Sequence, residues 1–196
     1  MKATLILGTL WLGAIFSACG PAGSLGERRQ AAVAADDAFE WEVRWDVPGQ
    51  TPIGQYLGLR NFFLPGGQSI QYYRHIYGIE MVFTGDETRN VRFESKADLP
   101  VITEGELVSI EVRSARPLRY QPRDDGVSLG WSDDFAYEWQ VLTRPGEAVL
   151  SGTRVRLHNT SAGADLVYCP RTQGIALGWS TDCIRDDPTD PTAPTE

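Results

Sequence analysis

The chain has 196 residues, of which 26 are Asp or Glu and 18 are Lys or Arg, so its formal net charge is −8. A chain with this balance is poorly suited to nucleic-acid binding, because contacts to phosphate require a basic face. The composition argues against a nucleic-acid partner and leaves the other classes of function to the motifs.

The first 18 residues have the features of an export signal. Lys2 supplies a positive start, and residues 3–16 form a nearly uninterrupted apolar run. That run is too short to span a bilayer, which takes about 20 apolar residues, but it fits the apolar region of a secretory signal. Residues 1–18 are therefore expected to be removed from the mature protein.

The residues after the apolar run resemble a bacterial lipobox, in which small residues precede a cysteine that is acylated. Here Ser17 and Ala18 lead to Cys19. The resemblance implies that Cys19 becomes the first mature residue and carries a lipid that anchors the protein to a membrane. Because Gly20 lacks the Asp that retains many lipoproteins in the inner membrane, the resemblance also implies the outer membrane. The alternative is ordinary secretory cleavage, which would give a secreted protein.

Two segments with few large apolar side chains flank the expected domain. Residues 19–38 are rich in Gly, Ala, Ser and charge, so they bury too little surface to offset the entropy of ordering and are expected to form a flexible tether. Residues 186–196 are acidic and rich in Pro and Thr, which is typical of a disordered tail. The fold is therefore expected within residues 39–185.

The strongest pattern in the domain is an internal repeat of 48 residues. Residues 118–134 align with residues 166–182 without a gap, and most aligned positions are identical. Residues 70–86 align in the same register and keep the apolar alternation. Apolar residues at every second position indicate strands with one buried face, so each segment is predicted to form a β-hairpin. The glycines expected near the turns are Gly78, Gly126 and Gly174.

Two further elements repeat ahead of the hairpins. Short alternating segments open the units at residues 39–43, 91–94 and 137–141, and apolar runs follow at residues 56–61, 107–112 and 155–159. Each unit thus holds about four short strands, and the whole domain about twelve. Because no stretch sustains an apolar period of 3.6 residues, helices are expected to be minor.

Three such units are too few for an ordinary propeller and too irregular for a solenoid. They can close as a β-trefoil, in which six strands form a short barrel and three hairpins cap one end. The hairpins would then carry Phe83, Trp131 and Trp179 toward a threefold axis. The alternative is a β-sandwich, which also has short alternating strands but needs no threefold repeat.

Over residues 39–185 the chain resembles β-trefoil modules of the MIR, fascin and ricin-B groups. Residues 152–159, followed by Asp165 and Leu166, are similar to the family pattern of alternating apolar residues, a polar Asn and then a pair ending in Leu. The Gln-x-Trp signature of the ricin-B lectins is absent. Sugar binding is therefore not transferred residue by residue.

Motifs for catalysis or metal binding are not evident. The two histidines, His75 and His158, fall in different repeats, and the sequence has no Gly-x-Ser-x-Gly nucleophile motif. Adjacent aspartates such as Asp133 and Asp134 point apart on a strand or turn, where Asp commonly serves the turn itself. The sequence therefore predicts no catalytic residue, no metal site and no cofactor.

The repeated hairpins carry a candidate ligand site. In trefoil lectins a carboxylate accepts hydrogen bonds from sugar hydroxyls while a neighbouring aromatic ring covers the apolar face of the sugar, and the resemblance points to equivalent positions here. The candidates are Tyr120, Arg123, Trp131, Asp134, Tyr168, Arg171, Trp179 and Asp182, with Asp86 at the same place in the first unit. The alternative is structural, with both indoles in phase with core leucines and the aspartates in turns.

The cysteines suggest a disulfide. Once Cys19 carries a lipid, Cys169 and Cys183 remain and can bond in an oxidising compartment. Their disulfide would close a loop of about 15 residues and add roughly 3 kcal/mol in the chain-entropy account.

The function we expect is that of a lipid-anchored, non-enzymatic binding module at the cell envelope, with carbohydrate as the ligand class implied by the trefoil lectins. One alternative is a protein-binding trefoil that uses a single protruding loop, for which the aromatic-rich residues 62–69 are the candidate. Another is a purely structural envelope lipoprotein. The expected partners are a membrane, through the lipid, and either a glycan or an envelope protein.

Overall fold

The computed structural model describes residues 39–64, 66–74, 78–85, 89–124, 126–171 and 174–183. The expected export signal, Cys19, the tether and the acidic tail lie outside these residues, as do His75 and Asp86. Within the described ranges, no helix has the length and apolar character needed to cross a membrane.

All regular secondary structure in the described ranges is β-strand, which confirms the predicted all-β class. The twelve strands are β1 (Trp41–Arg44), β2 (Tyr56–Asn61), β3 (Ser69–Tyr72), β4 (Met81–Thr84), β5 (Val91–Ser95), β6 (Leu107–Val112), β7 (Pro117–Tyr120), β8 (Leu129–Trp131), β9 (Trp139–Leu142), β10 (Arg154–Asn159), β11 (Ala164–Tyr168) and β12 (Leu177–Trp179). Their number agrees with the four short strands expected in each third of the domain.

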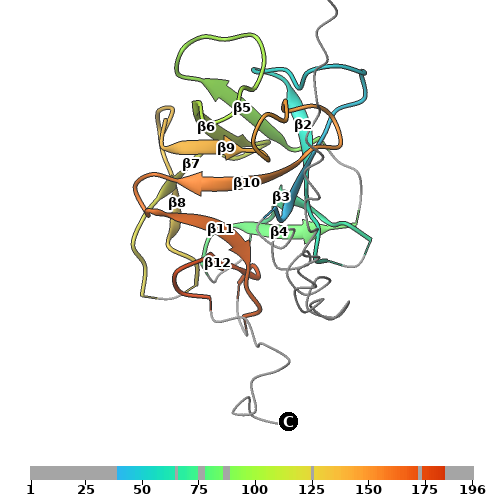
Figure 1. Ribbon diagram of the computed structural model, residues 1–196. Coiled ribbons are helices and arrows are strands. Elements are labelled where there is room, and N and C mark those ends of the chain that lie inside the picture. Colours follow the sequence, from blue (N-terminus) through green and yellow to red (C-terminus); the bar gives the residue numbers. More distant parts are fainter. Residues whose placement is uncertain are drawn as a thin grey trace, which may run out of the picture.

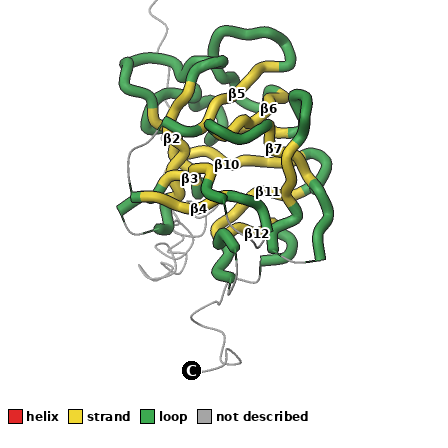
Figure 2. The backbone as a smooth tube through the Cα atoms, turned by 180° about the vertical axis from the view of Figure 1, so that it is seen from behind, coloured by secondary structure: helices red, strands yellow, loops and turns green. Residues whose placement is uncertain are grey.

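Six of the strands form a closed barrel (Figures 1 and 2). Around the ring, β1 pairs with β2, β2 with β5, β5 with β6, β6 with β9, β9 with β10, and β10 again with β1, all antiparallel. Closure removes the unpaired edges that an open sheet would present to other chains. The ring also differs from a β-sandwich, the alternative fold, which has two separate facing sheets.

The other six strands form three hairpins, each joined to one barrel strand. The hairpin β3–β4 extends from β2, β7–β8 extends from β6, and β11–β12 extends from β10. The predicted glycines have positive φ, at 65° for Gly78, 75° for Gly126 and 76° for Gly174. Figures 1 and 2 both show β4 next to β11 and β12, so hairpins from the two ends of the domain lie side by side.

The core is filled by alternate residues of the barrel strands, and its largest side chains are two buried indoles. Three cross-strand pairs occupy the same place in the barrel: Trp41 with Asn61, Trp139 with Asn159, and Val91 with Val112. In the middle pair, valine replaces both the indole and the amide. This paired replacement explains why residues 91–94 match the other opening segments only weakly.

The two indoles also fasten hairpins to the barrel. The Trp41 Nε1–H donates to the carbonyl oxygen of Leu166 in β11 at 2.7 Å, and the Trp139 Nε1–H donates to that of Leu118 in β7 at 3.0 Å. A buried N–H without an acceptor would cost about 1–3 kcal/mol. The acceptors therefore fix where each hairpin sits on the barrel.

The strands β1 and β9, which open the first and third units, begin at Trp41 and Trp139. Each start lies two residues after the start of the predicted segment. The carbonyl oxygens of the preceding glutamates bond to the first residues after β2 and β10, one step beyond the last paired residues of these strands. Glu40 accepts from the N–H of Phe62 at 2.7 Å, and Glu138 accepts from the N–H of Thr160 at 2.8 Å.

Candidate functional site

The predicted site aromatics pack against one another across the three hairpins. Each tyrosine that ends the first strand of a hairpin contacts a ring near the end of the second strand of another hairpin. The ring centroids are 6.2 Å apart for Tyr72 and Trp131, 5.8 Å for Tyr120 and Trp179, and 6.5 Å for Tyr168 and Phe83. The contacts run from the first hairpin to the second, from the second to the third, and from the third back to the first.

This packing leaves little ring surface for a ligand. Trp179 is 3% exposed and also stacks on the buried Trp139, with ring centroids 6.0 Å apart. Trp131 is half-buried against the core. Trp179 therefore holds the structural position that its phase with Leu177 indicates, and Trp131 packs against Tyr72 and the core.

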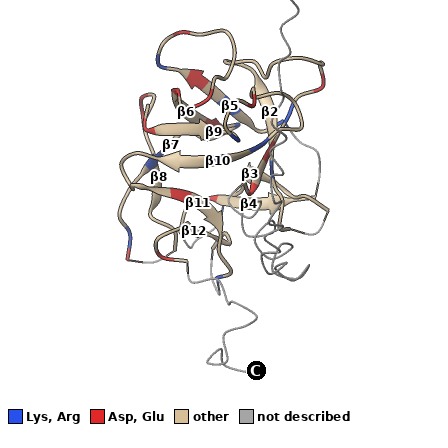
Figure 3. Ribbon diagram, in the orientation of Figure 1, with Lys and Arg blue, Asp and Glu red and all other residues tan. Residues whose placement is uncertain are grey.

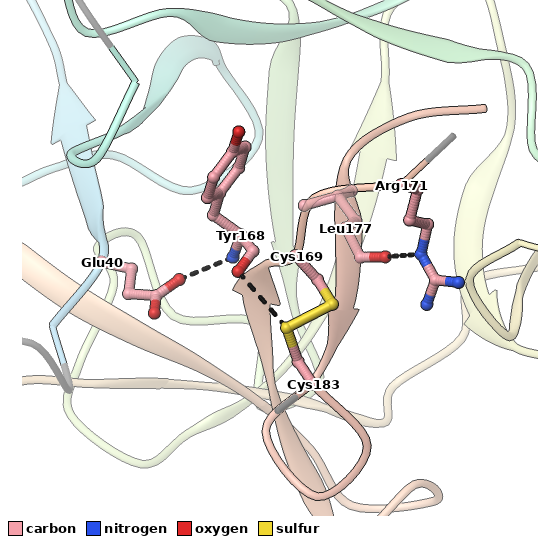
Figure 4. Close-up of a disulfide and its surroundings, with 6 residues drawn as sticks. All are labelled: Glu40, Tyr168, Cys169, Arg171, Leu177 and Cys183. Carbon is pink, nitrogen blue, oxygen red and sulfur yellow. Dashed lines mark hydrogen bonds between the residues drawn. A yellow bond between two sulfur atoms is a disulfide. The ribbon is translucent and has the colours of Figure 1, made fainter. Parts of the chain in front are cut away.

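The two predicted arginines bind backbone within their own hairpins. The Nε–H of Arg123 donates to the carbonyl oxygen of Leu129, and that of Arg171 donates to the carbonyl oxygen of Leu177, both at 2.5 Å (Figure 4). Arg123 also reaches the carbonyl oxygen of Gly78 in the first hairpin at 3.5 Å. These guanidiniums brace the hairpins.

The two predicted aspartates are exposed at turns. The backbone N–H of Asp182 donates to the carbonyl oxygen of Trp179 at 2.9 Å, and the Asp182 carboxylate accepts from the Thr181 hydroxyl at 3.0 Å. Asp134 follows β8 at the surface. Each carboxylate thus follows the strand that carries its indole, and none of the eight predicted residues lines either of the two cavities of about 360 and 100 Å³.

Two glutamates, the buried Glu40 and the half-buried Glu138, were not singled out by the sequence analysis and hold the hairpins in place. Glu138 accepts from the backbone N–H of Tyr120, from Asn159 Nδ2 at 3.0 Å and from the Ser161 hydroxyl at 2.7 Å. Glu40 accepts from the backbone N–H of Tyr168 at 2.7 Å (Figure 4). The repeated Glu-Trp dipeptide was the sequence feature that could have revealed this role.

The predicted disulfide between Cys169 and Cys183 is confirmed (Figure 4). It joins the residue after β11 to the turn after β12, with the two Cα atoms 5.8 Å apart. A side chain at Gly178 would bring its Cβ to 2.8 Å from the Cβ of Cys169. Glycine is therefore required where the disulfide crosses β12.

His158 has a structural partner. Its Nδ1 lies 2.8 Å from Asp165 Oδ1, and Arg156 lies 3.4 Å from the other oxygen of the same carboxylate. Among the residues that the structure describes, no group of three or more His, Cys, Asp or Glu side chains could hold a metal ion.

A cavity of about 360 Å³ lies between the first and third hairpins, lined chiefly by apolar side chains of β4 and by residues 174–176. The first hairpin differs from the other two at this place. Gly130 and Gly178 lie under Gln121 and Cys169, where a Cβ would clash. The first hairpin has Val82 at this place. The residue that matches Gln121 is Tyr73, which is turned outward, is 57% exposed and borders the cavity.

The segment of residues 62–68, called the contact loop below, presents aromatic rings to solvent. Phe62 is 46% exposed and Phe63 is 37% exposed, with their ring centroids 5.7 Å apart. Arg154 lies over the ring of Phe62, with 3.4 Å between its guanidinium carbon and the ring centroid. The contact loop is thus an exposed aromatic surface with a cation beside it.

Hydrogen bonds hold the described part of the contact loop in one conformation. Arg60 donates from Nε to the carbonyl oxygen of Gly67 at 2.6 Å and from Nη2 to that of Gly66 at 2.7 Å. The Phe63 N–H donates to Asn61 Oδ1 at 3.0 Å, and the Asn61 N–H donates to the carbonyl oxygen of Gln68 at 2.8 Å. The loop is closed at its base before any partner binds.

Comparison of the chain with models of protein families, with curated proteins and with solved structures finds no match. The functional proposal therefore comes from the residues of this chain.

Proposed function

We propose that this chain is a non-enzymatic binding module of the cell envelope, built as a β-trefoil and anchored by a lipid on Cys19, and that it contacts a protein partner through the contact loop. The observation that carries the proposal is the pair of exposed phenyl rings on a loop already held in place by Arg60.

The trefoil assignment is supported by the spacing of the strands and by the ring contacts. The strands β4, β8 and β12 begin at Met81, Leu129 and Leu177, so their starts are 48 residues apart. Three hairpins attach in the same way to a six-strand barrel, and their aromatic contacts form a cycle. These features favour three equivalent units around a pseudo-threefold axis.

The proposed location at the cell envelope depends on the lipobox-like residues before Cys19, which lie outside the described ranges. The disulfide supports it, because such bonds form and persist in oxidising compartments. A lipid at the end of a tether would hold the domain near a membrane while leaving the contact loop free to meet a partner. The expected destination is the outer membrane.

A protein partner is favoured over a glycan by the chemistry of the contact loop. Exposed aromatic residues are enriched at the centres of protein interfaces, where each buried ring contributes about 1.5–3 kcal/mol. A loop already ordered before binding also avoids part of the entropy cost of association.

The test is capture of a partner from envelope extracts by the purified full chain. We expect Phe62→Ser combined with Phe63→Ser to lower recovery of a specific protein at least tenfold, because both rings would be buried in the complex. Phe135→Ser is the matched control, since Phe135 is also 46% exposed but lies outside the contact loop. Equal recovery with the double variant and the control would contradict the proposal.

Carbohydrate is the second candidate ligand, favoured by the exposed ring of Tyr73 at the edge of the 360 Å³ cavity. A glycan array probed with the same full chain separates the two candidates. Glycan binding that Tyr73→Ala removes and the contact-loop variant retains would replace the protein partner with a sugar.

A further inference from the structure

A second, polar cavity lies beside the base of the contact loop. Its volume is about 100 Å³, and three arginines from separate parts of the chain line it: Arg44, Arg60 and Arg89. Ser69, the first residue of β3, also lines it. In the view of Figure 3, basic and acidic segments are interspersed over the fold, so three guanidiniums at one small cavity are a local concentration of positive charge.

The unpaired hydroxyl of Ser69 indicates that this cavity can bind a ligand. Ser69 is 1% exposed, and its Oγ has no hydrogen-bond partner in the structure. Buried polar groups in proteins are nearly always paired, because an unpaired one costs about 1–3 kcal/mol. A hydroxyl at the wall of a cavity lined by arginines would gain a partner when an acceptor enters.

Carboxylates beside the cavity hold its arginines in place. Glu42 lies 2.8 Å from Arg44 and 3.9 Å from Arg60, and Asp46 pairs with Arg89. The guanidiniums are therefore held near one another before a ligand enters.

The guanidiniums are also positioned in advance. Arg60 is fixed by its two bonds to the contact-loop backbone, and Arg89 lies over the ring of Trp45, with 5.3 Å between the guanidinium carbon and the ring centroid. A guanidinium has five N–H donors and can contact more than one acceptor at once. Arginine forks of this kind match the oxygens of phosphate or sulfate.

We infer that this cavity binds one tetrahedral oxyanion group, phosphate or sulfate, either free in solution or carried on an acidic polysaccharide. The volume sets the size of the group, since one water molecule takes about 30 Å³ of the liquid. A cavity of about 100 Å³ admits one such anion. The oxyanion would accept from Ser69 Oγ and from the guanidiniums, and binding requires no partner at the contact loop.

The test is isothermal titration calorimetry of the purified full chain with inorganic phosphate and with sulfate. We expect Ser69→Ala to weaken anion binding by about tenfold to a hundredfold, as the loss of one hydrogen bond to a charged group predicts. Because the variant removes an unpaired buried hydroxyl, its melting temperature without anion should stay equal or rise. A role of Ser69 in stability alone would lower the melting temperature and leave anion binding unchanged.

Arg89→Gln should weaken anion binding at least tenfold, since it removes a charged donor. Arg116→Gln is the matched control, because Arg116 is also an exposed arginine paired with an aspartate, Asp133, but lies away from the cavity. Anion affinity that falls equally in both arginine variants, and does not fall in Ser69→Ala, would overturn the inference in favour of unspecific charge attraction.

Dextran sulfate and neutral dextran separate the two sources of the oxyanion. Binding of dextran sulfate alone, with the same dependence on Ser69 and Arg89, identifies the polysaccharide as the source. Binding of inorganic anions with no gain from the polymer identifies the free anion. Failure of phosphate, sulfate and dextran sulfate alike would overturn the inference, whatever the result at the contact loop.

Discussion

At the scale of single residues, Glu111 in β6 connects β2 and β5 through its side-chain contacts with Tyr56 and Arg92. Its carboxylate accepts from the Tyr56 hydroxyl at 2.8 Å and pairs with Arg92. Arg113 lies over the ring of Tyr56, 4.4 Å from its centroid. Burial raises the pKa of Tyr56, and the hydrogen bond and negative charge of Glu111 raise it further. The phenol is therefore held in its neutral form by its surroundings.

The raised pKa of Tyr56 makes stability depend on pH in the alkaline range. The contribution is fully present below about pH 10, the ordinary pKa of tyrosine, and is lost as pH rises through the folded-state value. Tyr56→Phe should therefore reduce the alkaline loss of unfolding free energy and cost about 1 kcal/mol at pH 7. Urea unfolding between pH 7 and pH 11 measures both effects, with Tyr73→Phe as control. Identical pH profiles for wild type and Tyr56→Phe would contradict this account.

The sequence predicted residue roles only where they depend on phase within a strand. The spacing of Trp179 from Leu177 indicated a packed indole, and the structure agrees. The ring that packs on it, Tyr120, belongs to another unit, and contacts between units leave no mark in a local pattern. The unpaired hydroxyl of Ser69 was equally hidden, because only the folded chain shows which side chains lack a partner.

At the scale of elements, the three hairpins share one plan and differ in how they are fastened. The third hairpin has a disulfide across β12, which its small residue Gly178 makes room for. The second has Gln121 over Gly130 in the same place. The first has Val82 there, and Tyr73, which matches Gln121, is exposed at the edge of the 360 Å³ cavity. The first hairpin thus lacks the side-chain cover that the other two have at this place.

Removal of the disulfide should weaken the third hairpin and the whole domain. The bond spans 14 residues, and a loop of about this length is worth roughly 3 kcal/mol. Replacing Cys169 and Cys183 together by Ser should therefore lower the melting temperature by roughly 6–12 °C for a domain of this size. Differential scanning calorimetry of the variant and of wild type, both without reductant so that the wild type keeps its disulfide, measures the change. A shift below about 2 °C would show that the native disulfide adds little.

The hairpins were predictable as elements because each has its own alternation and turn glycine. The first residues of the opening strands β1 and β9 could not be predicted from the sequence. Glu40 and Glu138 continue the alternating pattern, but their carbonyl oxygens bond to loops that come later in the chain. Strand ends are set by such distant partners, which lie beyond the reach of a local pattern.

At the scale of the whole molecule, the repeat gave the number of strands and the all-β class, and the pairing of strands gave the closed barrel. The repeat alone does not say which barrel strands meet at closure. That follows from β1 pairing with β10, a contact between the first and last thirds of the domain. Sequence analysis left a β-sandwich open because both folds use short alternating strands.

The central claim is that three units meet around one axis through their aromatic rings. Nuclear Overhauser contacts between aromatic protons of the full chain test it most directly. We expect contacts between Tyr72 and Trp131, between Tyr120 and Trp179, and between Tyr168 and Phe83. Tyrosines that contact only the ring of their own hairpin, such as Tyr120 with Trp131, would contradict the claim.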